Sequence, residues 1–340
     1  MTKITEYLEI LLEGGNLKYE QAKDLLDTVF EGQVAEVQIA AFLAAMRMKK
    51  ATSEEFAGLA QSLRDHCVKV NTKKMPLIDT CGTGGAPIKT FNVSTAAAIV
   101  AAGAGAYVAK HGNRGITSKC GSADVLEALG VKIDCPPDVV AECIENAHIG
   151  FMFAPLFHPA MKFVQPIRKS LDFRTAFNIL GPLANPAPVS AQIMGVPEES
   201  LLDRIAQTFR ILGIKQAMVV HGSGLDEISI TADTKVVELK DEKTTAYEIN
   251  PRDFINSSPK MSELIGTSAE QNAKIIKNVL YGSNKGPARD IIMLNAAAAI
   301  KVASLADDLR SGMKKAAESI DGKAAVMCLE KLIEISNRKK

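Results

Sequence analysis

The pattern of apolar residues changes abruptly near residue 70, and this change restricts the fold more than any other feature. Residues 1–70 hold four segments of helical periodicity, and Thr52 with Glu55 forms a capping-box pattern at the start of the fourth. After residue 73, short apolar runs alternate with helical segments. Such alternation is typical of parallel strands joined by right-handed crossovers. The sequence therefore predicts an α/β fold, with a small N-terminal all-helical domain and a larger α/β domain that has a mainly parallel central sheet.

Individual elements follow from the same periodicities. We expect strands at 77–80, 106–110, 131–134, 150–155, 191–196, 216–222 and 227–230. We expect helices at 94–103, 122–130, 136–148, 201–213 and 291–303, with further helices up to the C-terminus. Ser122 is expected to be the N-cap of the second of these helices, and Gly130 its stop.

A stretch rich in proline and arginine, residues 158–188, interrupts the α/β pattern and indicates a crossing back to the helical domain. We therefore expect a helical domain of residues 1–70 with a later contribution from about 163–185. Residues 73–162 and 186–340 form the expected α/β substrate-binding domain. The third helical segment, 34–49, is apolar almost all round. We expect it to be buried on more than one side, against another domain or a second subunit.

Composition excludes several classes of protein. The chain has 340 residues, and Lys+Arg 40 against Asp+Glu 39 leaves a formal charge of +1, which argues against a general nucleic-acid or polybasic membrane surface. Six cysteines without a C-x-x-C pair indicate reduced thiols in a cytoplasmic protein. Residues 91–109 carry no charge, but they are mostly small, so we expect a packed helix and a buried strand and no membrane span.

Two glycine-containing loops follow predicted strands, where ligands of open α/β sheets collect. The loop "CGTGGAPIKT" suits phosphate binding through backbone N–H groups. It fits neither the dinucleotide pattern, because Pro87 stands three residues after Gly84, nor a Walker motif, because the lysine is missing. The alternative is a tight turn whose glycines serve only steric needs.

The second loop, "AKHGNRGITSKCGS", strengthens the phosphate hypothesis. Lys110, His111 and Arg114 are cationic or potentially so, Asn113 offers an amide, and hydroxyls come from Thr117, Ser118 and Ser122. Together they suit a phosphate cradle. Taken singly, His111 is equally well explained as a hydrogen-bonded structural histidine and Lys110 as a solvated charge.

A third segment, "HGSGLDEISI", carries the adjacent acids Asp226 and Glu227. In a loop, both carboxylates can face a cleft and hold Mg²⁺ together with substrate phosphates. The alternative is a pair of acids that merely decorate a turn.

The segments "DTCGTGG", "TFNVST", "AKHGNR", "GSADVLEALG", "FAPLFHPAMK", "RTAFNILGPLANP" and "HGSGLDEIS" resemble those of the anthranilate phosphoribosyltransferase family, in family order and over almost the whole chain. The resemblance implies the second step of tryptophan biosynthesis. In that step, 5-phosphoribosyl 1-pyrophosphate and anthranilate give N-(5-phosphoribosyl)anthranilate and pyrophosphate. It also implies a transferase with Mg²⁺, two ions per subunit, and a homodimer joined through the helical domain.

The resemblance assigns site residues position by position. For 5-phosphoribosyl 1-pyrophosphate it implies Gly82, Gly85, Ala86, Thr90, Asn92, Val93, Ser94, Thr95, Lys110, His111, Gly112, Asn113, Arg114, Gly115, Ile116, Thr117, Ser118 and Ser122. For anthranilate it implies Gly82, His111, Asn113, His158 and Arg168. For metal it implies Ser94, Asp226 and Glu227. Ala86 departs from the family, which commonly has an aspartate there.

The chemistry fits these residue types. The aryl amine of anthranilate is a weak nucleophile, so we expect catalysis to come mainly from neutralising the departing pyrophosphate and from positioning the acceptor. No residue is assigned as a general base. Two other interpretations are a pyrimidine nucleoside phosphorylase of the same fold, which would use free phosphate, and a non-catalytic paralogue that binds nucleic acid.

Overall fold

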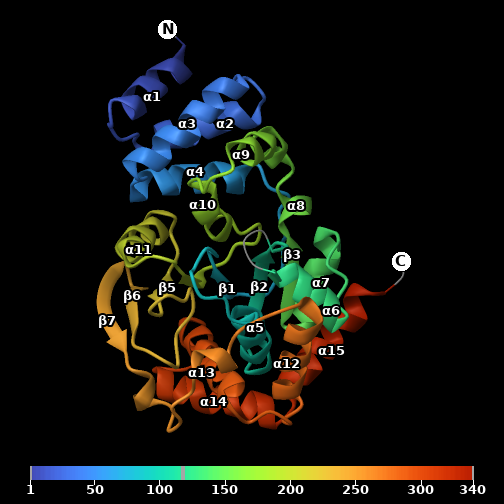
Figure 1. Ribbon diagram of the computed structural model, residues 1–340. Coiled ribbons are helices and arrows are strands. Elements are labelled where there is room, and N and C mark those ends of the chain that lie inside the picture. The colour runs from blue at the N-terminus through green and yellow to red at the C-terminus, as the bar shows by residue number, and fades with distance from the viewer. Residues whose placement is uncertain (1, 116–118, 339–340) are drawn as a thin grey trace.

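The computed structural model describes residues 2–115 and 119–338. Helices from the first 65 residues gather at one end of the molecule, and a sheet covered by helices forms the rest (Figure 1). The N-terminal helices are α1 (Lys3–Leu12), α2 (Tyr19–Phe30), α3 (Glu36–Lys49) and α4 (Ser53–Asp65). The four helices expected before residue 70 are thus confirmed.

The predicted capping box begins α4. Thr52 Oγ1 accepts a hydrogen bond from the N–H of Glu55 at 3.3 Å, and Glu55 Oε2 accepts one from the N–H of Thr52 at 2.7 Å. The Glu55 carboxylate is fully buried and also accepts from the Leu17 N–H and from Lys49 Nζ. One side chain therefore joins α4 to α3 and to the loop before α2.

Helix α3 is buried on one side only within the single chain. Phe42 and Leu43 lie in the core, whereas Val37 and Met48 are 77% and 84% exposed. A helix that leaves such side chains in water lacks a partner on its second face.

The central sheet has the order β3-β2-β1-β4-β5-β6-β7. Its strands are β1 (Leu77–Gly82), β2 (Tyr107–Gly112), β3 (Ile149–Phe153), β4 (Ala191–Gly195), β5 (Gln216–His221), β6 (Thr234–Lys240) and β7 (Lys243–Ile249). The first five pair in parallel, and the last two pair antiparallel. This confirms the predicted α/β fold with a mainly parallel sheet.

Helices cover both faces of this sheet. They are α5 (Val93–Gly103), α6 (Ser122–Leu129), α7 (Pro137–Ala147), α11 (Leu202–Ile211), α12 (Ala269–Leu280), α13 (Pro287–Val302), α14 (Leu309–Asp321) and α15 (Ala324–Ser336). Ile78 and Ile193 pack with α5 and α13 on one face, whereas Leu77 and Met194 pack with α11 and the N-terminal helices on the other. None of the helices that the structure describes combines the length and apolar content needed to cross a membrane.

Between β3 and β4 the chain runs to the N-terminal helices and back through α8 (Ala154–Phe157), α9 (Gln165–Leu171) and α10 (Phe177–Leu183) (Figure 1). Arg64 Nε of α4 donates to the Leu183 carbonyl at 2.8 Å. Residues of α9 and α10 share one core with the N-terminal helices. The exact domain boundaries stay a prediction.

Two expected strands are wrong. Residues 131–134 and 227–230 contain no strand. The N–H of Lys132 donates to Ser336 Oγ at 3.2 Å, and the N–H of Ile228 donates to Asn295 Oδ1 at 2.9 Å. Side chains of helices that are distant in the sequence therefore accept the hydrogen bonds that these backbone N–H groups would donate to a neighbouring strand.

The start of α6 also differs from expectation. Its N-cap is Gly121, and Ser122 is the first helical residue. Asp124, in the first turn, accepts from the Gly121 N–H at 2.8 Å, so it satisfies the helix end in place of Ser122. Gly130 ends the helix with φ +104°, as predicted.

Candidate active site

A cleft of about 610 Å³ lies where the carboxyl ends of β1 and β2 face α8, α9 and α10. The predicted residues that line it are Gly82, Thr90, Asn92, Ser94, Thr95, Lys110, His111, Gly112, Asn113, Arg114, Gly115, Ser122, His158, Arg168, Asp226 and Glu227. Gly85, Ala86 and Val93 do not line it, and Ala86 and Val93 are buried. Ile116, Thr117 and Ser118 lie outside the described residues.

The acid pair lies against the glycine loop after β1. The Gly84 N–H donates to Asp226 Oδ2 at 2.8 Å, and a Cβ at position 82 would collide with the same carboxylate. Thr90 Oγ1 donates to Glu227 Oε1 at 3.0 Å. Glycine is therefore required at position 82 so that Asp226 can approach the end of β1 closely.

This pair has the properties of a cation site. Burial raises the pKa of both carboxyls, and the charge of Asp226 raises the pKa of Glu227 further. Glu227 Oε2 is buried and has no hydrogen-bond partner among the described residues. Within residues 2–115 and 119–338 no three His, Cys, Asp or Glu side chains converge as they would around zinc. Mg²⁺ needs only one or two carboxylates with substrate phosphates, so the residues fit that ion.

Lys110, at the end of β2, is buried rather than solvated. Its side chain is 1% exposed, and its Nζ donates to the Thr80 carbonyl at 2.6 Å. Burial raises the pKa of the neighbouring Asp79 carboxyl to about 6 and lowers the pKa of the Lys110 ammonium. Asn185 Nδ2 donates to Asp79 Oδ2 at 2.8 Å and to the Ala109 carbonyl at 2.8 Å. This network fixes Lys110 against the floor of the cleft.

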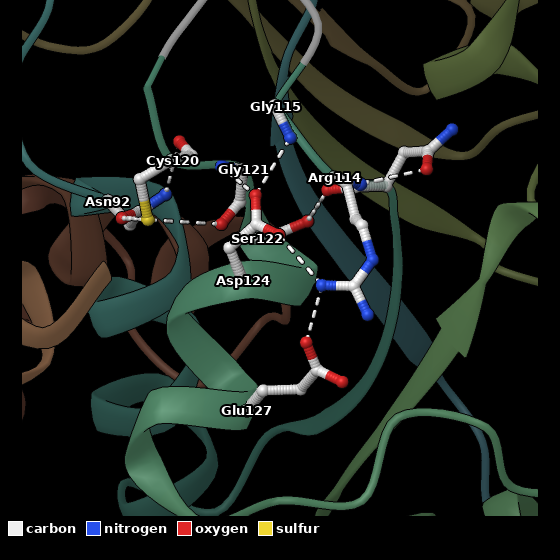
Figure 2. Close-up of polar contacts among 9 residues, drawn as sticks. Asn92, Arg114, Gly115, Cys120, Gly121, Ser122, Asp124 and Glu127 are labelled. Carbon is white, nitrogen blue, oxygen red and sulfur yellow. Dashed lines mark hydrogen bonds and ion pairs between the residues drawn. The ribbon is translucent and has the colours of Figure 1, made fainter. Parts of the chain in front are cut away.

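Figure 2 shows how one carboxylate, that of Asp124, contacts described residues on both sides of the segment between β2 and α6. Asp124 Oδ2 accepts from the N–H groups of Gly115 and Gly121, at 2.9 and 2.8 Å. Arg114 Nη1 lies 2.9 Å from Asp124 Oδ1 and 2.5 Å from Glu127 Oε2. Partial burial acts to raise the pKa of Asp124, but these hydrogen bonds leave it below its usual value. The guanidinium of Arg114 is thus turned toward acids of α6.

The far end of this loop is tied to Asn92, before α5 (Figure 2). Asn92 Nδ2 donates to the Cys120 carbonyl at 3.3 Å, and Cys120 Sγ donates to Asn92 Oδ1 at 3.1 Å. Asn272 of α12 donates to the same oxygen at 2.9 Å. Two of the predicted phosphate-binding segments are therefore connected directly.

Two neutral histidines line another part of the cleft. The rings of His111 and His158 lie 5.0 Å apart, and His111 Nδ1 lies 3.2 Å from the Gly181 carbonyl. Burial lowers the pKa of His111 to about 3 and that of His158 to about 4. His111 is therefore not a cation at neutral pH. The Nε2 atoms of both rings are buried without a partner among the described residues.

Arg168, in α9, is a cationic residue that lines the cleft. Its guanidinium lies 5.5 Å from the centroid of the Phe177 ring, and burial lowers its pKa. Within the described chain it forms no ion pair with a carboxylate. An anionic ligand could therefore supply the negative charge that pairs with the Arg168 guanidinium.

The sequence interpretation missed a second arginine of the same segment. Arg174 lines the cleft, and its Nη2 donates to the Gly84 carbonyl at 3.2 Å. Lys89 and Phe177 also line the cleft without having been predicted. The sequence signal for it is the pair of arginines in "IRKSLDFRTAF".

Known proteins resemble this chain over nearly its whole length. The glycosyl transferase family α/β domain matches residues 74–325, and the helical bundle domain of that family matches residues 5–67. Anthranilate phosphoribosyltransferase of Methanocorpusculum labreanum is 47% identical over 337 residues, which cover 99% of each chain. The same enzyme of Haloferax volcanii is 46% identical over 320 residues, which cover 94% of this chain and 96% of the relative.

Solved structures agree. Anthranilate phosphoribosyltransferase from Thermus thermophilus superposes with a TM-score of 0.92 at 36% identity, covering 97% of this chain and 99% of that one. The Saccharomyces cerevisiae enzyme in complex with PRPP and Mg superposes with a TM-score of 0.88 at 29% identity, covering 98% and 97%. The chain belongs to the anthranilate phosphoribosyltransferase family.

Proposed function

We propose that this protein transfers the phosphoribosyl group of 5-phosphoribosyl 1-pyrophosphate to the amine of anthranilate. The products are N-(5-phosphoribosyl)anthranilate and pyrophosphate, and the reaction is the second step of tryptophan biosynthesis. One observation carries the proposal: a single cleft joins two glycine-containing loops and an acid pair to an arginine without a carboxylate partner among the described residues. Relatives of this chain carry the name of that enzyme, and one solved relative is a complex with 4-fluoroanthranilate.

In the reaction, the bond between the anomeric carbon and the pyrophosphate oxygen breaks, and its electron pair leaves with pyrophosphate. The nitrogen lone pair of anthranilate forms the new C–N bond, and the amine loses one proton, which water or the departing pyrophosphate accepts. Because the amine is a weak nucleophile, stabilising the leaving group and orienting the acceptor matter most. His111 and His158 are weak bases at their low pKa values, and we assign neither as a general base.

The donor is held by the loops after β1 and β2. The residues proposed for it that line the cleft are Gly82, Thr90, Asn92, Ser94, Thr95, Lys110, His111, Gly112, Asn113, Arg114, Gly115 and Ser122. Fixed N–H groups and the ammonium of Lys110 would meet the phosphate charge without rearranging during the reaction. Gly85, Ala86 and Val93, which the resemblance also assigns to the donor, do not line the cleft, and Ala86 and Val93 are buried.

Mg²⁺ is proposed to bind Asp226, Glu227 and Ser94, with two ions per subunit. Glu227 Oε2, which has no hydrogen-bond partner in the described part of the chain, and the raised pKa values of the two carboxyls support this assignment. When bound, the metal neutralises negative charge on the pyrophosphate. The protein's own contribution is the fixed position of the two carboxylates, which Gly84 and Thr90 hold by hydrogen bonds.

The acceptor is proposed to bind where Gly82, His111, Asn113, His158 and Arg168 line the cleft. A guanidinium matches a carboxylate with two parallel hydrogen bonds, so Arg168 would hold the carboxylate of anthranilate. The two neutral histidines would bring ring faces and nitrogen acceptors to the same region.

We also propose a cytoplasmic homodimer that forms through α1 and α3. The exposed apolar side chains Leu12, Val37 and Met48 support this surface. The six cysteines all lie within the described residues and form no disulfide, which supports a reducing compartment.

The test of the activity is to mix the purified protein with anthranilate, 5-phosphoribosyl 1-pyrophosphate and Mg²⁺ and to follow anthranilate fluorescence. The fluorescence should fall only when all three are present. No fall with these substrates, together with release of a free base from a pyrimidine nucleoside and inorganic phosphate, would favour a phosphorylase and overturn the proposal.

A further inference from the structure

Arg174 brings a guanidinium to the glycine loop of β1 from the opposite wall of the cleft. It lies between α9 and α10, and its Nη2 donates to the Gly84 carbonyl at 3.2 Å. Gly85 has φ +83°, and a Cβ there would collide with the guanidinium. The positive charge therefore lies directly against the loop that follows β1.

The Arg174 guanidinium has N–H groups left to donate to a ligand. Among the described residues, Arg174 forms no ion pair with a carboxylate, and its Nε and Nη1 donate no hydrogen bond. Gly84, whose carbonyl accepts from Arg174, donates its own N–H to Asp226 Oδ2 at 2.8 Å, so one residue of the loop contacts both the guanidinium and the acid pair. By contrast, Arg289 lies 2.8 Å from Asp321, and Arg338 lies 2.6 Å from Glu142.

The backbone of Arg174 is held from the N-terminal helices. Its carbonyl accepts a hydrogen bond from Arg47 of α3, whose guanidinium lies 5.3 Å from the centroid of the Phe173 ring. The next N–H, of Thr175, donates to Asn178 Oδ1 at 2.9 Å. The side chain therefore extends into the cleft from a fixed base.

We propose that Arg174 is a further substrate-binding residue, which contacts the pyrophosphate group of the donor; this inference rests on the proposed function. A guanidinium donates to phosphate oxygens in pairs. Negative charge grows on the pyrophosphate as its bond to the anomeric carbon breaks, so a cation fixed there stabilises the leaving group. Two arginines of one segment then serve different substrates, with Arg168 beside Phe177 binding the acceptor and Arg174 beside Gly84 binding the donor.

The test compares the full-length variants Arg174→Gln, Arg174→Lys and, as a matched control, Arg168→Gln. Calorimetric titration with pyrophosphate in the presence of Mg²⁺ measures donor-side binding without turnover. Arg174→Gln should weaken pyrophosphate binding by about ten- to a hundredfold, and Arg174→Lys should recover part of the loss. Arg168→Gln should bind pyrophosphate as the wild type does.

Steady-state kinetics provide the second readout. Arg174→Gln should raise the KM for 5-phosphoribosyl 1-pyrophosphate or lower kcat, and should leave the KM for anthranilate within a small factor. Unchanged pyrophosphate binding in Arg174→Gln would overturn the proposal. So would an equal rise of both KM values with a lowered melting temperature, which indicates a structural link between the two walls. A wild type that forms no product but binds pyrophosphate through Arg174 would refute the proposed function and support this assignment.

Discussion

Replacing Arg168 with alanine should impair use of the acceptor and spare use of the donor. The guanidinium is half-buried, its pKa is lowered by burial, and within the described chain it has no carboxylate partner. A hydrogen bond to a charged group contributes about 1.5–3 kcal/mol. Because each 1.4 kcal/mol corresponds to about a tenfold change, kcat/KM for anthranilate should fall by about ten- to a hundredfold.

A second consequence of the substitution concerns stability. The contact of Arg168 with the Phe177 ring is also lost, at a cost of about 0.5–1 kcal/mol to the folded protein. This loss acts equally on every acceptor, so it cannot change the choice between acceptors.

The assay therefore compares anthranilate with aniline, which lacks the carboxylate. The wild type should strongly prefer anthranilate, and Arg168→Ala should lose most of that preference, while the KM for 5-phosphoribosyl 1-pyrophosphate stays within a small factor. Arg168→Lys should remain impaired, because a lysine cannot form two parallel hydrogen bonds. If a folded Arg168→Ala variant still discriminates as the wild type does, Arg168 does not bind the carboxylate.

Three further outcomes are expected. Replacing both Asp226 and Glu227 with alanine should raise the Mg²⁺ concentration needed for half-maximal turnover and lower kcat; an unchanged Mg²⁺ titration would remove the metal assignment. Glu55→Ala should lower the free energy of unfolding by about 3–5 kcal/mol in urea denaturation, because it leaves a buried ammonium unpaired; a loss below about 1 kcal/mol would show that this carboxylate is dispensable. Replacing Val37 and Met48 with glutamate should give a monomer in analytical ultracentrifugation, and a persisting dimer would place the interface elsewhere.

Much of the fold could be predicted because apolar residues are spaced differently along buried parallel strands and along helices. The two wrong strands, 131–134 and 227–230, show the limit of this signal. Both have apolar residues at alternate positions, and Val131 and Ile228 are buried. Whether such a segment joins a sheet depends on which group pairs with its backbone, and here the partners are Ser336 and Asn295, which are distant in the sequence.

The antiparallel hairpin of β6 and β7 was missed for a local reason. Asp241 and Glu242 turn the chain with φ of 49° and 63°. Turns of two residues with positive φ usually contain asparagine or glycine. Without those residues, the sequence carries little indication of the turn.

The sequence predicts where the site lies, but not which of its side chains carry a charge. The loops after β1 and β2 and the acid pair come together because the carboxyl ends of parallel strands share one edge of the sheet. The state of Lys110 and His111 depends on burial, which short sequence patterns do not reveal. Arg174 was overlooked because its contact with Gly84 joins two segments that are far apart in the chain.

The central claim is that this protein joins anthranilate to a phosphoribosyl group. The most direct measurement is mass spectrometry of the products that the purified protein forms from anthranilate, 5-phosphoribosyl 1-pyrophosphate and Mg²⁺, with pyrophosphate quantified in the same sample. We expect N-(5-phosphoribosyl)anthranilate and pyrophosphate in equal amounts, and less of both, still in equal amounts, with the variant in which Asp226 and Glu227 are replaced by alanine. Pyrophosphate released without a phosphoribosylated acceptor, or no reaction of a folded wild type, would contradict the account.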